Sequence, residues 1–146
     1  MRAPMPEGKI EFFVTAPVER VWSFLSDLRQ VGQCVPGVEN IRVLDETHAQ
    51  WDLVVKVGPL SQTITVTTET LEQVPLQRGA FRGQAENLDM MGTIELAPAE
   101  GGTRVGYRMK VNAKGPLARV IDNFIRTRLK SQTEAFAAKV KQELEA

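Results

Sequence analysis

The C-terminal stretch from Gly115 to Ala146 most constrains what this chain of 146 residues can fold into. No proline or glycine follows Pro116, and Leu, Ala, Lys, Arg, Glu and Gln, all good helix formers, dominate the stretch. Pro116 suits the first turn of a helix, where its missing N–H is not needed. The stretch therefore predicts one helix of about 30 residues, roughly 45 Å long, which is enough to cross a small domain.

Apolar residues recur along this stretch with the helical period and predict the face that meets a core. They are Leu117, Val120, Ile121, Phe124, Ile125, Leu129, Phe136, Val140 and Leu144. Arg128 falls on the same face, and Gln132 lies one turn further along. Two interpretations stay open: Arg128 lays its stem on the core and reaches water, or both polar residues face a cavity that holds something polar.

Composition indicates an ordinary globular chain without a strong electrostatic field. Hydrophobic residues make up 42% of the sequence, and 18 basic side chains balance 18 acidic ones, so we expect no nucleic-acid partner. The length predicts a single domain over residues 1–146, with residues 1–7 flexible. Because no signal peptide or membrane-spanning run is recognisable, we expect a cytoplasmic protein.

Seven strands and two short helices are predicted before the long helix. Alternating apolar and polar residues predict strands from Gly8 onward and over 38–45, 49–57, 62–74, 79–85, 92–97 and 104–113. The stripe of Val18, Val21, Trp22 and Leu25 predicts a short helix after Pro17, and a second helical turn is expected over 28–34.

Short connections between consecutive strands predict an antiparallel sheet with one apolar face. Only the C-terminal helix is long enough to cover that face. We therefore predict an α+β fold in which a curved, seven-stranded antiparallel sheet wraps around the long helix, with two short helices after the first strand. Glycines within the strands, at positions 79, 83, 92 and 106, predict bends or close approaches. A cavity between sheet and helix is expected.

Several short motifs, taken in order, carry a resemblance to a known family. They are Val21-Trp22 with Leu25 and Asp27, Cys34-Val35-Pro36-Gly37, Val55-Lys56-Val57-Gly58-Pro59, Gly102-Thr103-Arg104 and Gly115-Pro116-Leu117-Ala118. On these motifs the chain resembles the CoxG-like family of carbon monoxide dehydrogenase subunits, which belongs to the START-like, or SRPBCC, superfamily. The resemblance spans nearly the whole chain and implies the helix-grip fold.

The resemblance also implies a function. Family members resemble lipid-binding domains, are not catalytic, and are linked to quinone handling and to bringing a molybdenum-containing dehydrogenase to the membrane. We therefore expect a hydrophobic ligand, a membrane quinone such as menaquinone, with no covalent cofactor and only transient contact with the inner face of the membrane. Some members add a C-terminal membrane anchor. Because this sequence ends at Ala146, no anchor of that kind is expected.

Residues that would support catalysis or bind a metal are few. His48 is the only histidine and Cys34 the only cysteine, too few for a usual zinc site. Cys34 is predicted to be a small buried hydrophobe and His48 a solvated turn residue. Inward positions offer Tyr107 and Arg128 but no His, Asp or Glu, so the chain is predicted not to be an enzyme. A polyketide cyclase/dehydratase-like enzyme and a ligand-free assembly adaptor are the alternatives.

Aromatic and methionine side chains predict a pocket for a large, flat, apolar ligand, because rings stack and methionine adapts to irregular shapes. Tyr107 and Arg128 are predicted to orient the ligand. The complete predicted set of ligand-binding residues is Trp51, Leu53, Phe81, Met90, Met91, Tyr107, Met109, Leu117, Ile121, Phe124 and Arg128. Pro59-Leu60 and Leu88 with Met90-Met91 are the predicted membrane-contacting segments.

Overall fold

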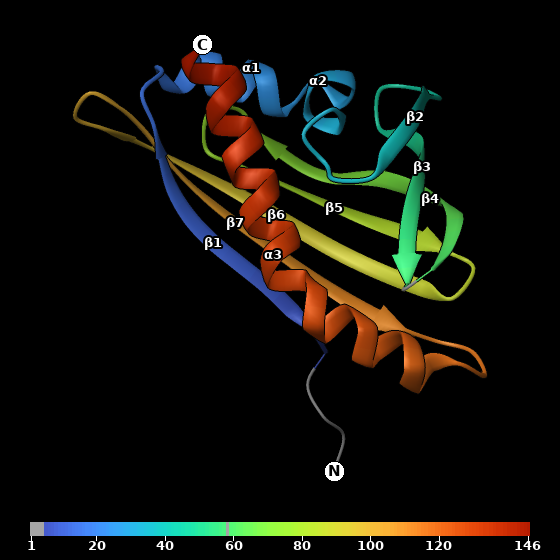
Figure 1. Cartoon of the computed structure of the whole chain (residues 1–146). Helices are drawn as coiled ribbons and strands as arrows, with labels where there is room; N and C mark the ends of the chain where they lie inside the picture. The colour runs from blue at the N-terminus through green and yellow to red at the C-terminus, as the bar shows by residue number, and fades with distance from the viewer. Residues whose placement is uncertain (1–4, 58) are drawn as a thin grey trace.

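The computed structural model describes residues 5–57 and 59–146. In chain order the elements are β1 (Glu7–Val14), α1 (Val18–Leu25), α2 (Leu28–Gly32), β2 (Val38–Val43), β3 (His48–Val57), β4 (Leu60–Val74), β5 (Arg78–Ala85), β6 (Leu88–Ala99), β7 (Gly102–Ala113) and α3 (Ala118–Glu145). Figure 1 shows α3 running across one face of the sheet.

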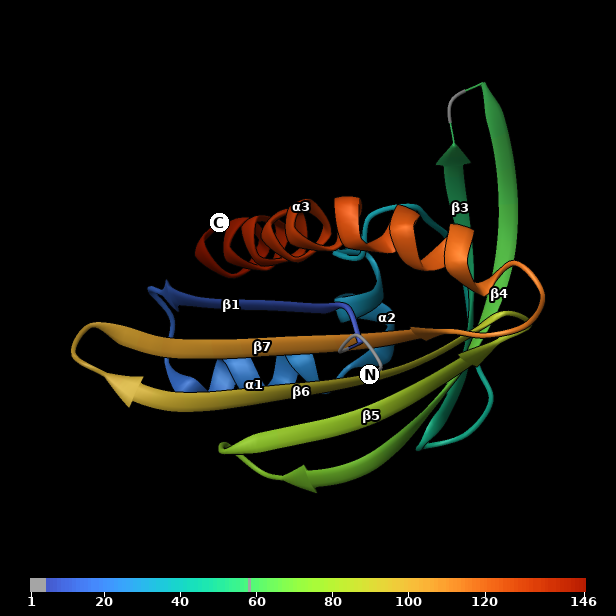
Figure 2. The same cartoon turned by 90° about the horizontal axis from the view of Figure 1, so that it is seen from below.

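The strands form one seven-stranded antiparallel sheet within the described residues, in the order β1-β7-β6-β5-β4-β3-β2. Five hairpins connect β2 through β7 in sequence, and β1 joins the edge beside β7, with Ile10 opposite Tyr107. Figure 2 shows β1, β7 and β6 nearly level while β3 and β4 rise steeply beside the first turns of α3. The predicted fold class, a curved antiparallel sheet around a long helix, is confirmed.

Alternation along β7 separates a dry face from a wet one. Val105, Tyr107 and Val111 are buried, whereas Arg104 and Arg108 on the opposite face are exposed. The sequence pattern predicts this orientation because successive side chains of a strand point to opposite faces. The dry face is the one that α3 and the short helices cover.

Helix α3 is held by its C-terminal half. Its buried residues, Leu129, Thr133, Phe136, Ala137, Val140 and Leu144, all lie after residue 128. Close packing on β1 depends on Gly8, since a Cβ atom there would lie 2.5 Å from Cγ2 of Thr133. The helix begins at Ala118 and not at Pro116. Leu117 and Val120, predicted to face the core, are 62% and 67% exposed.

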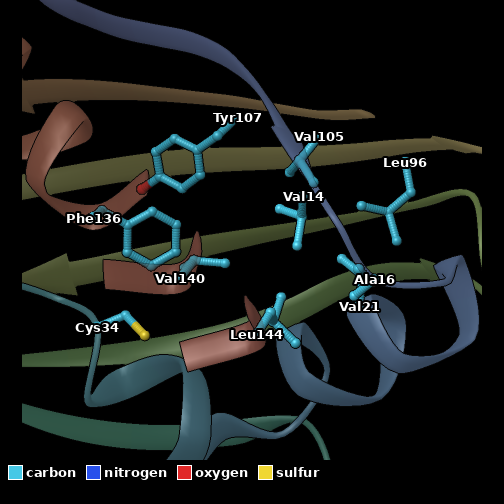
Figure 3. Packing of buried hydrophobic residues seen from close by; sticks show 10 residues of the cluster. All are labelled: Val14, Ala16, Val21, Cys34, Leu96, Val105, Tyr107, Phe136, Val140 and Leu144. Atoms are coloured by element: carbon cyan, nitrogen blue, oxygen red, sulfur yellow. The ribbon is translucent and has the colours of Figure 1, made fainter. Parts of the chain in front are cut away.

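The packed core joins the sheet, the short helices and the second half of α3 (Figure 3). Its buried members are Val14, Ala16, Val21, Cys34, Leu96, Val105, Tyr107, Phe136, Val140 and Leu144. The prediction that Cys34 is a buried hydrophobe is confirmed, since it is 1% exposed.

Several element boundaries differ from the sequence prediction, by up to four residues. Strand β6 begins at Leu88, not Gly92, because Leu88–Met91 pair with β5 and β7 and the turn lies just before them. Strand β1 already begins at Glu7, and the backbone N–H of Val111 donates to the Pro6 carbonyl at 3.0 Å. Pro6 and Glu7, predicted to belong to a flexible tail, are therefore held against β7, and residues 1–4 lie outside the described residues.

Candidate ligand-binding cavity

The junction between α1 and α2 is fixed by a side-chain cap. Asp27 Oδ1 accepts hydrogen bonds from the backbone N–H groups of Arg29 and Gln30, at 3.0 and 3.3 Å. Such a cap satisfies donors that the start of a helix leaves unpaired. Gly32, at the end of α2, then allows close approach to the sheet, because a Cβ atom there would lie 2.6 Å from Cζ3 of Trp51.

Two strand glycines let large side chains lie against the sheet. A Cβ atom on Gly83 would lie 2.7 Å from Cγ of Met90, and one on Gly92 would overlap the ring of Phe81. The close approaches predicted from the strand glycines are confirmed at these two positions. Both Met90 and Phe81 thereby keep their inward orientation.

A cavity of about 270 Å³ lies between α3, the α1–α2 junction and the inner face of the sheet. Aliphatic, aromatic and methionine side chains make up most of its wall. Some lining residues, Glu72 and Gln73 on β4 and Gln132 on α3, are exposed, so the cavity reaches the surface. The fold therefore contains the space between sheet and helix that the sequence predicts.

Six of the eleven predicted ligand-binding residues come together around this cavity. They are Trp51, Leu53, Phe81, Met90, Tyr107 and Met109. Strands β3, β5, β6 and β7 each contribute to the set, which brings positions separated by up to 58 residues to one wall. That a ligand contacts these residues stays a prediction.

The other five predicted residues lie outside the cavity wall. Met91 is 53% exposed on the outer face of β6, because it directly follows the inward-facing Met90. Leu117 is exposed, and Ile121 and Phe124 are half-buried on the first turns of α3, beyond the cavity. The exposed Arg128 places its guanidinium 4.8 Å from the centre of the Phe124 ring. Of the two polar residues on this helix face, Gln132 alone lines the cavity.

Sequence reasoning missed a polar segment of the wall on β4. Thr68, Thr70, Glu72 and Gln73 all line the cavity. A bulge between Thr70 and Glu72 shifts the register against β5 and brings adjacent residues to the same side. The prediction that no inward position holds Asp or Glu is therefore wrong at Glu72, whose carboxylate lies 2.7 Å from Nε of Arg78.

The short helices also contribute more of the wall than predicted. Their lining residues are Trp22, Leu25, Ser26, Leu28 and Val31, followed by Val35 and Pro36 in the next loop. The apolar stripe of α1 was the available signal, but a stripe does not reveal whether it meets packed core or open space.

Most buried polar groups of the wall are satisfied within the protein. Trp51 Nε1–H donates to Oγ1 of Thr68 at 2.8 Å, and the hydroxyls of Ser26 and Thr133 donate to carbonyls of their own helices. The Tyr107 hydroxyl borders the open cavity, and no residue in the described part of the chain hydrogen-bonds to it. Burial raises the Tyr107 pKa well above its usual value, so the hydroxyl stays protonated.

The single cysteine and histidine do not line the cavity. Burial raises the pKa of the Cys34 thiol to about 11, which leaves little thiolate at neutral pH. The His48 ring lies between Asp45 and Glu69, with nitrogen–oxygen distances of 2.9 and 3.1 Å, and these carboxylates raise its pKa.

Residues 5–57 and 59–146 contain no group of three or more His, Cys, Asp or Glu side chains placed to hold a metal ion. Over the same residues, no helix combines the length and the apolar character needed to cross a bilayer.

Solved structures share this fold at low sequence identity. A conserved protein from Geobacillus kaustophilus superimposes with a TM-score of 0.77 at 21% identity, over 94% of this chain and 93% of that chain. A protein from Thermus thermophilus gives 0.72 at 19% identity, over 95% and 97%. The Zhui aromatase/cyclase from Streptomyces sp. R1128 gives 0.73 at 18% identity, over 97% and 94%.

Comparison with curated protein sequences gave no match. A family profile does match, over residues 11–145, and so includes α1 to α3 and nearly all of the sheet. It therefore covers both the cavity wall and the packed core. The chain belongs to the CoxG family of carbon monoxide dehydrogenase subunits.

Proposed function

We propose that this chain is a binding protein that holds a membrane quinone in the cavity between α3 and the sheet, and that it serves a carbon monoxide dehydrogenase-type molybdenum enzyme. The cavity wall is the observation that carries the proposal. It consists mainly of aliphatic, aromatic and methionine side chains, interrupted by few polar groups. Such a wall gains free energy when it takes up an apolar molecule of matching size.

The volume limits how much of a ligand the cavity can enclose. An apolar cavity of about 150 Å³ is sufficient for benzene, and pockets for drug-sized ligands begin near 300 Å³. At about 270 Å³, this cavity suits the two fused rings of a naphthoquinone. A long isoprenoid tail would leave it where exposed lining residues such as Gln132 reach the surface.

Family membership supports the partner. The CoxG family takes its name from carbon monoxide dehydrogenase, and a quinone is the acceptor that would link such a dehydrogenase to membrane electron transport. The protein would carry the quinone between the dehydrogenase and the membrane. It would act in the cytoplasm, without catalysing the oxidation itself.

Quinone exchange also requires transient contact with the inner face of the membrane. Of the predicted contact segments, Met91 is exposed, Leu88 is half-buried and Met90 lines the cavity, whereas the Leu60 side chain lies outside the described residues. Burying an apolar side chain gains about 1.5–3 kcal/mol, so a few such contacts would give brief, reversible binding.

A catalytic role, as in a polyketide cyclase or dehydratase, is the second candidate. One observation favours it: Glu72 and Tyr107 line the same cavity in a fold shared with an aromatase/cyclase. However, its raised pKa makes Tyr107 a poor base at neutral pH, and the Glu72 carboxylate is paired with Arg78. Both features favour binding over acid–base catalysis.

Transfer of menaquinone from liposomes tests the proposal. The purified protein is mixed with menaquinone-loaded liposomes, the two are separated by flotation, and quinone is extracted from the protein fraction. We expect up to one quinone per chain, with less transfer for a Leu60→Ser, Met91→Ser variant. If no quinone is transferred, and the double substitution changes neither liposome association nor activity of the partner dehydrogenase, the carrier function is wrong. The chain would then be interpreted as a ligand-free assembly adaptor.

A further inference from the structure

We propose that the cavity selects uncharged ligands and that the Tyr107 hydroxyl orients them by hydrogen-bonding to one oxygen atom of the ligand. This inference rests on the proposed function, because it names the chemical class that the same cavity accepts. That class is a ring-sized, uncharged molecule with a carbonyl or hydroxyl oxygen. Fatty acids and other carboxylates are disfavoured.

The charge of the wall supports the first part. Among the residues that the structure describes, no Lys, Arg or His lines the cavity, and Glu72 is its one charged side chain. Glu72 pairs with Arg78, and both side chains are about half exposed, at 49% and 51%. An anionic ligand would therefore give up hydration without finding a cation in the wall, which is costly.

The distribution of hydrogen bonds supports the second part. Ser26, Thr68 and Thr133 line the cavity but already use their hydroxyls within the protein. The Thr70 hydroxyl also has no partner among the described residues, but Thr70 is only half-buried. Gln132 is exposed and can be hydrated. Tyr107 is 9% exposed, and its hydroxyl has no partner among the described residues. A deeply placed group with unused hydrogen-bonding capacity is the natural contact for a ligand oxygen.

The position of Tyr107 makes such a contact specific. Its ring packs on Phe136, with centroids 4.7 Å apart. In Figure 3 the Tyr107 oxygen points away from Val14 and Val105, which belong to the packed end of the core. Tyr107 and Phe136 also line the cavity, whereas Val14 and Val105 do not. The hydroxyl is therefore held by rigid neighbours where packed core gives way to open space.

Three probes with the same naphthalene ring system test both parts by calorimetric titration. 2-Acetonaphthone is uncharged and carries a carbonyl, 2-ethylnaphthalene is uncharged and lacks one, and 2-naphthoate carries a carboxylate. For the wild-type chain at neutral pH, we expect 2-acetonaphthone to bind most tightly. 2-Naphthoate should bind at least about 10-fold more weakly, because its charge must be desolvated.

Tyr107→Phe isolates the hydrogen bond. Because the hydroxyl has no protein partner, the variant should keep its melting temperature within a few degrees. Its affinity for 2-acetonaphthone should fall by about 3- to 10-fold, as expected for one hydrogen bond, while its affinity for 2-ethylnaphthalene should not change. An equal effect on both probes, or none on either, overturns the role of Tyr107.

Gln132→Lys isolates the charge selection. The substitution adds a cation at an exposed lining position of α3, and Ser131→Lys adds the same charge at a neighbouring exposed position off the cavity. We expect Gln132→Lys, and not Ser131→Lys, to raise the affinity for 2-naphthoate several-fold. Equal binding of 2-naphthoate and 2-acetonaphthone to the wild type overturns the selection but leaves the binding function standing. If none of the three probes binds, both the selection for uncharged ligands and the proposed binding function fail.

Discussion

Tyr107 is the only tyrosine of the chain, so its ionisation can be followed without interference from another phenol. Burial alone raises its pKa, since no neighbouring charge contributes to the shift. The hydroxyl faces the cavity in which a ligand is proposed to bind. The titration of this one group therefore reports whether that part of the wall is apolar.

In an alkaline titration followed by near-ultraviolet absorbance, we expect no tyrosinate near the ordinary tyrosine pKa of about 10. The folded state holds the phenolic proton more tightly than the unfolded chain does. The stability that the protonated Tyr107 hydroxyl contributes to the folded state is present below about pH 10 and is lost as the pH rises further. Tyrosinate should thus appear together with unfolding, measured by circular dichroism. Ionisation near pH 10 with an unchanged dichroism spectrum would contradict an apolar wall.

Helix α3 divides into two halves with different roles. Its C-terminal half is anchored in the core by Phe136, Val140 and Leu144. The N-terminal half leaves Leu117 and Val120 exposed and lies beside the rising β3–β4 hairpin (Figure 2). Stability should therefore depend mainly on the C-terminal half.

Two truncations on the same helix test this division by chemical denaturation. Phe136→Ala should lower the free energy of unfolding by about 3–5 kcal/mol, because it removes a buried ring and its contact with Tyr107. Val120→Ala should change it by about 0.5 kcal/mol or less, because Val120 is exposed. Similar losses for both variants would show that the N-terminal half is packed as well.

The elements themselves could be predicted from the sequence where a local period is strong. The alternation in β7 and the helical period after Leu129 agree with the structure. The bulge after Thr70 could not be predicted, because it depends on pairing with β5 and leaves no mark in the local pattern. The same limit applies to Leu117 and Val120, since a period identifies a face but not its partner.

At the scale of the whole molecule, the fold class could be predicted because the order of elements allows few arrangements. The site could be predicted only in part. Six of the eleven predicted residues line the cavity, since strand alternation places them on the dry face. The wall formed by the α1–α2 junction could not be predicted, because it depends on how these helices lie on the sheet.

One consequence of the fold is that the space under α3 is filled at one end and open at the other. Leu144, Val21 and Val14 pack tightly near the C-terminal end of α3, while Leu129 and Thr133 border the cavity. Thr70 lies on the wall with a side chain that no described residue hydrogen-bonds. It is therefore a position at which the cavity can be filled without removing an internal contact.

The most direct test of the central claim is a calorimetric titration of the intact chain with menadione, a small naphthoquinone. Thr70→Trp fills the cavity, and Thr67→Trp places the same side chain at an exposed position of β4 outside it. We expect saturable 1:1 binding of menadione to the wild type and to Thr67→Trp. Binding to Thr70→Trp should be abolished or at least about 10-fold weaker. The dichroism spectrum of Thr70→Trp should match that of the wild type. Equal binding by all three proteins, or no binding to the wild type, would contradict a quinone site between α3 and the sheet.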